Sequence, residues 1–67
     1  MNLRLNGKTV EIKEENMSLY DFLVSKQFEL ERLVVELNLE IAPKERWREI
    51  ILKENDTIEV LRFVGGG

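Results

Sequence analysis

Cysteine and histidine are both absent from this 67-residue chain. Without them there is no disulfide framework, thiol nucleophile, imidazole base or usual zinc site. No loop clusters carboxylates as a calcium-binding loop does, so no metal site is predicted. The apolar runs are too short to cross a bilayer, and no membrane role is predicted. We therefore expect a soluble, cytoplasmic protein that is not an enzyme by itself.

Charge of one sign is not concentrated anywhere along the chain. Lys and Arg total 10, Asp and Glu total 13, and the net charge is −3. Contact with nucleic acid requires a concentrated basic face, so nucleic acid is not predicted as a partner. The apolar content of 43% fits a folded domain. A chain this short forms one domain with a small core.

The first 13 residues alternate apolar and polar side chains around Asn6-Gly7. Asn-Gly is the strongest short hairpin signal, because a type I′ turn needs a positive φ at both central residues. The turn pairs Leu5 with Lys8 and continues outward in register. One face then holds Met1, Leu3, Val10 and Ile12, and the other holds Asn2, Arg4, Thr9 and Glu11.

A helix is predicted to begin after Ser18, whose side chain can cap it, with Asp21 three residues later. Leu19, Phe22 and Leu23 form its apolar stripe. We expect about three turns, ending at Phe28 or Glu29. Tyr20 is interpreted as shielding the edge of the core rather than binding a ligand.

Three further strands are predicted after the helix. Residues 32–38 and 57–64 alternate or are rich in β-branched side chains, and residues 50–52 form a brief apolar run. Trp47 is interpreted as a lid on the core. The last strand is the most apolar, so it belongs in the middle of the sheet, parallel to the first.

These elements predict an α+β fold of the β-grasp, ubiquitin-like type. Its mixed sheet has four to five strands, with one helix packed across one face. The domain is expected to span residues 1–64. Residues 65–67, Gly-Gly-Gly, are expected to form a flexible C-terminal tail.

The final strand departs from simple alternation of apolar and polar side chains. Leu61 and Phe63 fall on the face that the hairpin marks as polar. One interpretation is ordinary exposure of single apolar side chains, or a cover formed by Trp47. The other is a partner-binding patch of Leu61, Phe63 and Val64 beside the glycines. Arg62, between them, is expected to serve packing or a salt link.

Two stretches resemble the bacterial sulfur carrier proteins of thiamine biosynthesis, a ubiquitin-like family. They are END-x-IEVLRFVGGG (54–67) and LNLEIAPKERW (37–47). The likeness spans the whole chain. One departure is that the family often has Asn-Gly where this chain has Asn38-Leu39. Leucine resists positive φ, so the turn here is expected to differ or lengthen.

The resemblance implies that the Gly67 carboxylate is the reacting group, with Gly65 and Gly66 as an arm. An adenylating, E1-like enzyme would activate that carboxylate with ATP. A sulfur donor system would convert it to a thiocarboxylate, and a thiazole synthase would take the sulfur. The chain itself would bind no cofactor and would be a monomer when free.

Other functions stay open on the sequence alone. The chain could be a sulfur carrier for molybdopterin synthesis, or a ubiquitin-like modifier conjugated through its C-terminal glycine. A plain β-grasp binding module, in which the glycines do nothing, is a third possibility.

Overall fold

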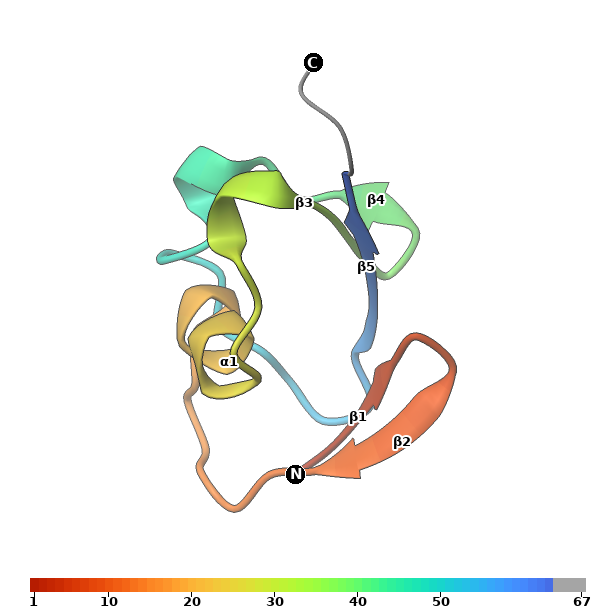
Figure 1. The fold of residues 1–67 in the computed structure, drawn as a ribbon. Coiled ribbons are helices and arrows are strands. Elements are labelled where there is room, and N and C mark those ends of the chain that lie inside the picture. Colours follow the sequence, from red (N-terminus) through yellow and green to blue (C-terminus); the bar gives the residue numbers. More distant parts are fainter. Residues whose placement is uncertain (64–67) are drawn as a thin grey trace.

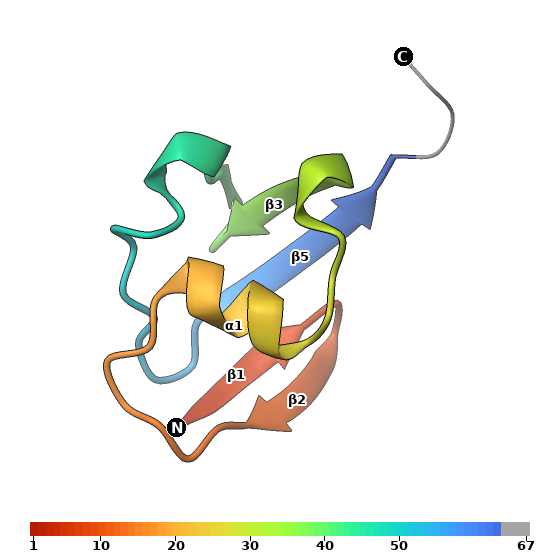
Figure 2. The same cartoon turned by 60° about the vertical axis from the view of Figure 1, so that its left-hand side comes forward.

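The computed structural model describes residues 1–63 as a five-stranded sheet with one α-helix. In chain order the elements are β1 (Asn2–Leu5), β2 (Lys8–Glu11), α1 (Leu19–Ser25), η1 (Leu30–Arg32), β3 (Leu33–Leu37), β4 (Glu40–Ile41), η2 (Lys44–Arg46) and β5 (Thr57–Arg62). The strand order is β2-β1-β5-β3-β4, and only β1 and β5 are parallel. Helix α1 lies across one face of the sheet (Figures 1 and 2). The β-grasp prediction is confirmed.

The hairpin formed by β1 and β2 has the predicted register. Leu5 is opposite Lys8, and the pairing continues to Asn2 opposite Glu11. The turn residues Asn6 and Gly7 have φ values of 49° and 84°. Both are in the left-handed region that a type I′ turn requires, which explains why Asn-Gly occurs there.

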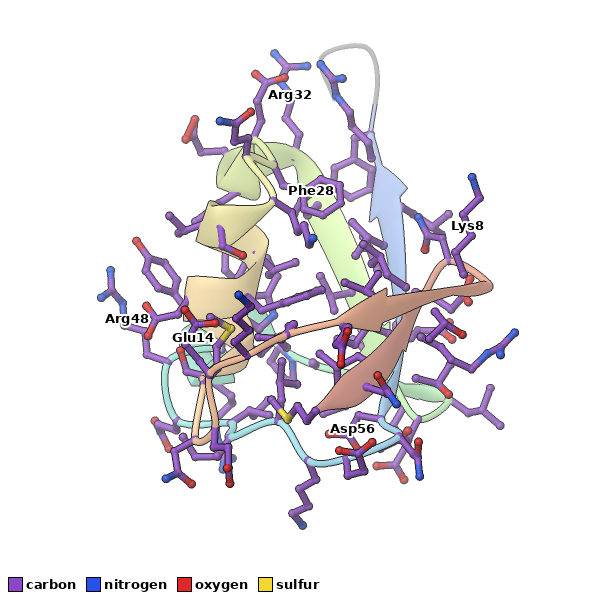
Figure 3. The ribbon with its side chains drawn as sticks, turned by 90° about the horizontal axis from the view of Figure 1, so that it is seen from below. Lys8, Glu14, Phe28, Arg32, Arg48 and Asp56 are labelled. Atoms are coloured by element: carbon purple, nitrogen blue, oxygen red, sulfur yellow. The ribbon has the colours of Figure 1, made fainter. Side chains whose placement is uncertain are left out.

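Helix α1 starts as predicted and ends earlier than predicted. The Ser18 hydroxyl accepts a hydrogen bond from the Asp21 N–H at 2.9 Å. The helix has seven residues and ends at Ser25, so the prediction of three turns ending at Phe28 or Glu29 is wrong. Gln27 has a φ of 65°, which reverses the chain. This reversal brings the partly buried Phe28 back against the core (Figure 3).

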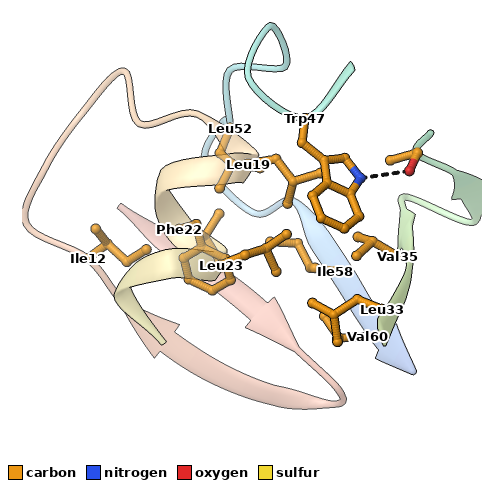
Figure 4. Packing of buried hydrophobic residues seen from close by; sticks show 12 residues of the cluster. Ile12, Leu19, Phe22, Leu23, Leu33, Val35, Trp47, Leu52, Ile58 and Val60 are labelled. Atoms are coloured by element: carbon orange, nitrogen blue, oxygen red, sulfur yellow. Dashed lines mark hydrogen bonds between the residues drawn. The ribbon is translucent and has the colours of Figure 1, made fainter. Parts of the chain in front are cut away.

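The core lies between α1 and the sheet, and Trp47 is its largest side chain (Figure 4). Only 2% of Trp47 is exposed, and its indole N–H donates to the Ala42 carbonyl at 2.8 Å. The interpretation of Trp47 as core is therefore confirmed. Tyr20 is half-buried at the edge of this cluster, with the Arg48 guanidinium 3.9 Å from its ring centre.

The predicted edge strand at residues 50–52 is wrong. Ile51 makes only an isolated bridge to Ser18, whereas the edge strand β4 is formed by Glu40 and Ile41 beside β3. The expectation that the turn at Asn38-Leu39, before β4, would differ or lengthen is also wrong. Asn38 and Leu39 form a tight connection with φ values of 53° and 73°.

Tertiary contacts explain why leucine is held in this unusual conformation. The Asn38 side chain accepts from the Thr57 N–H at 2.9 Å and donates to Asp56 at 3.0 Å. The Asn38 N–H donates to the Thr57 carbonyl at 2.8 Å. These three hydrogen bonds fix the turn against the start of β5. The short connection to β4 then forces Leu39 into a positive φ.

Candidate docking face and C-terminal end

The outward face of β5 exposes the two apolar side chains that the sequence singled out. Ile58 and Val60 are buried under α1, whereas 64% of Leu61 and 55% of Phe63 is exposed. Trp47 lies in the core on the other side of the sheet and does not cover them. The predicted exposure is confirmed, and their role as a partner-binding patch stays a prediction.

Two further apolar residues enlarge this face. Val34 on β3 is the partner of Leu61 on β5, and it is half-buried. Ile41 on β4 lies on the same side of the sheet and is 61% exposed. We call Val34, Ile41, Leu61 and Phe63 the outward patch. Sequence reasoning missed Ile41, because it did not predict β4.

Two contacts fix the end of β5 against η1. The Phe63 N–H donates to the Arg32 carbonyl at 2.8 Å. The Arg62 guanidinium pairs with the Glu29 carboxylate at 2.5 Å, as the expected salt link. That ion pair is exposed and by itself stabilises little. Together the two contacts define where the chain leaves the sheet, at the end where Arg32 lies (Figure 3).

The remaining predicted site residues are Val64, Gly65, Gly66 and Gly67, which lie outside the described residues. Their assignment and the domain boundary at residue 64 stay predictions. Within residues 1–63, no group of three or more potential metal ligands comes together. No helix in this part of the chain is long and apolar enough to span a membrane.

A hollow of about 340 Å³ lies elsewhere in the described part of the chain. Its lining includes Met1, Glu15, Lys53 and Glu54. Lys53 and Glu54 precede the start of β5, whereas the outward patch reaches the strand's other end. The lining of this hollow therefore shares no residue with the outward patch.

The fold and this site define a class: a small β-grasp protein whose last described residues lie beside an exposed apolar face. A model of the ThiS family matches residues 3–67, and the chain belongs to this family. It is 46% identical to the sulfur carrier protein ThiS of Bacillus subtilis (strain 168) over 65 residues. That match covers 97% of this chain and 98% of the relative.

A solved structure and a longer relative extend the comparison. The crystal structure of the thiamine biosynthesis protein ThiS from Geobacter metallireducens superimposes with a TM-score of 0.88. Its sequence is 32% identical, and the match covers 100% of both chains. The thiazole synthase of Magnetococcus marinus is 33% identical over all 67 residues, which are 20% of its length. The family suggested by the sequence is thus confirmed.

Proposed function

We propose that this chain is a sulfur carrier for formation of the thiamine thiazole ring, with Gly67 as the attachment point. The observation that best supports this function is the 46% sequence identity to the Bacillus subtilis sulfur carrier, over nearly the full length of both chains. The position of the outward patch also fits a carrier. The patch lies next to the end of β5, so an enzyme bound there would be close to the C-terminal residues.

The proposed chemistry takes place at the Gly67 carboxylate. A carboxylate oxygen attacks the α-phosphate of ATP in an adenylating enzyme, and pyrophosphate leaves. Sulfide supplied by the donor system then attacks the acyl carbonyl and displaces AMP, which leaves a C-terminal thiocarboxylate. The chain has no cysteine and so cannot hold a persulfide on its own side chains. The sulfur cargo therefore belongs on the terminus.

Covalent geometry limits where the enzymes can lie. Four residues follow Phe63, and even fully extended they span at most about 14 Å. An active site that reaches Gly67 must therefore lie close to Phe63. A contact on the outward patch would hold Gly67 near that active site at a high effective concentration.

The proposed partners are an adenylating enzyme, a sulfur donor system and a thiazole synthase. The thiazole synthase of Magnetococcus marinus, with a region similar to this whole chain, supports the last of these. Glycine at the end suits a narrow passage, because without a Cβ the backbone can approach closely. Ordering each glycine costs roughly 1–2 kcal/mol, which favours transient docking.

Intact mass spectrometry tests the proposal. The chain is incubated with the adenylating enzyme of its own organism, ATP and a sulfur donor. We expect a mass gain equal to exchange of one oxygen for sulfur, confined to the C-terminal peptide. The charged carrier is then offered separately to thiazole synthase and molybdopterin synthase. Transfer to molybdopterin synthase alone, or attachment of the chain to lysine, would replace the thiazole assignment.

A further inference from the structure

Glu36 and Glu59 form a like-charge pair in the centre of the outward face. They lie directly opposite each other on the antiparallel strands β3 and β5. Both side chains are half-buried. Like charges directly opposite each other destabilise a sheet, and partial burial weakens the screening by solvent. The pair is thus an unfavourable electrostatic contact, and it lies on β3 and β5, the two strands that carry Val34 and Leu61 of the outward patch.

No cation within residues 1–63 forms a salt bridge with either carboxylate. The two ion pairs in this part of the chain join Arg46 to Glu49 and Arg62 to Glu29. Arg4, the cation on the outward side of β1, donates instead to the Gly7 carbonyl at 3.1 Å. The repulsion between Glu36 and Glu59 is therefore not offset inside the described domain.

Apolar side chains flank these two carboxylates on the β4 side and toward the end of β5. Ile41 is opposite Glu36 on the other side of β3. Val34 and Leu61, themselves opposite each other, are the next outward-facing positions along β3 and β5. The face thus combines two anions with the apolar side chains of the outward patch. This pattern matches a partner surface that combines apolar side chains with a cation.

We propose that thiazole synthase docks on the outward patch with an arginine that bridges Glu36 and Glu59. This inference rests on the proposed function. The arginine guanidinium has five donors in a planar fork and can bond two carboxylates at once. Apolar contacts around it exclude water, which strengthens the attraction. Docking removes the repulsion between the carboxylates and places Gly67 within reach.

Thiazole synthase is the chosen occupant for a reason separate from the charges. In the Magnetococcus marinus protein, a region similar to this whole chain and a synthase share one polypeptide. The charge pattern then specifies what the synthase surface must contain. Glutamine has nearly the same shape as glutamate, so it removes the charge with little change in volume.

The test compares the wild-type chain with the Glu36→Gln/Glu59→Gln double variant. Binding to the purified thiazole synthase of the same organism is measured by calorimetry at low and high salt. We expect about tenfold weaker binding of the double variant at low salt. Wild-type affinity should fall with added salt, and that of the double variant should fall much less. The double variant should melt at or above the wild-type temperature.

The Glu11→Gln/Glu14→Gln variant is the matched control. Glu11 lies on the outward side of β2, two strands from β5, and Glu14 is exposed in the loop after β2. Removing both charges changes the net charge by two, as in the double variant, without touching the patch. We expect its binding to equal that of the wild type. An equal loss in this control would make the effect one of net charge and overturn the proposal.

Absence of wild-type binding to thiazole synthase, or unchanged binding by the double variant, would also overturn the proposal. So would a melting temperature of the double variant below that of the wild type. A loss of binding by the double variant to the adenylating enzyme, but not to thiazole synthase, would overturn it as well. The proposed function is judged separately, by thiocarboxylate formation on the wild-type chain. A thiocarboxylated carrier whose double variant still binds normally would contradict only the arginine contact.

Discussion

The side chain of Asn6 pairs with both backbone groups of Val60. Its carboxamide oxygen accepts from the Val60 N–H at 2.7 Å, and its nitrogen donates to the Val60 carbonyl at 3.3 Å. The Asn6 N–H itself donates to the Ile58 carbonyl at 2.9 Å. A turn residue thereby continues the β1–β5 pairing beyond the end of β1. It secures the central strand three residues before Phe63.

Replacing Asn6 by glycine isolates this side-chain contact, because glycine keeps the positive φ of the turn. We expect the free energy of unfolding to fall by about 1–2 kcal/mol, since two hydrogen bonds are lost. Urea denaturation measures the change. Asn6→Asp, which keeps the acceptor and loses the donor, should lose less. A glycine variant as stable as the wild type would show that the Val60 contact stabilises nothing.

Leu39 offers the opposite test, because its conformation is strained and its side chain is 86% exposed. A left-handed conformation costs a non-glycine residue roughly 1–2 kcal/mol. We expect Leu39→Gly to raise the free energy of unfolding by up to about 1 kcal/mol after the entropic cost of glycine. Leu39→Ala, which keeps the Cβ, should gain less. Destabilisation by Leu39→Gly in urea would mean that leucine packing outweighs the strain.

Phe63 and Val60 should separate binding from stability. As a hypothesis, Phe63→Ala weakens binding to the adenylating enzyme by about 1–3 kcal/mol, as exposed aromatic anchors do when truncated. Val60→Ala should instead lower stability by about 2 kcal/mol, because it removes buried methyl groups. Calorimetry with the enzyme and thermal melts of both variants check this. Normal binding by Phe63→Ala would remove Phe63 from the docking surface.

Deleting Gly66 and Gly67 should abolish adenylation and leave the melting temperature nearly unchanged. Within residues 1–63 the buried core lies between Leu3 and Val60, and glycine has no side chain to pack, so we expect the deletion to leave this core intact. ATP–pyrophosphate exchange by the adenylating enzyme provides the readout. Exchange at the wild-type rate would exclude Gly67 as the attachment point.

Gly66→Val tests the narrow passage without shortening the chain. Valine restricts the backbone and adds two methyl groups where the partner is expected to enclose the arm. We expect loss of ATP–pyrophosphate exchange with an unchanged melting temperature, and a smaller loss for Gly66→Ala. A valine variant that reacts at the normal rate would contradict a tight passage while leaving the carrier role intact.

Local patterns of the sequence were sufficient where an element depends on its own residues. The Asn6-Gly7 turn, the register of the hairpin and the Ser18 cap could all be predicted directly. The end of α1 could not, because Gln27 adopts a positive φ that lets Phe28 reach the core. A helical pattern does not reveal where packing of a later residue outweighs another turn.

The sequence by itself determined the β-grasp order of elements, the family and the exposure of Leu61 and Phe63. These follow from periodicity, turn chemistry and a terminal motif, which act over a few residues. Only the tertiary structure decided that Leu39 adopts a positive φ, that Ile41 joins the outward patch and that Glu36 faces Glu59. Each of these depends on which strands lie side by side. Cross-strand neighbours are far apart in the chain, so strand pairing, and not local propensity, sets them.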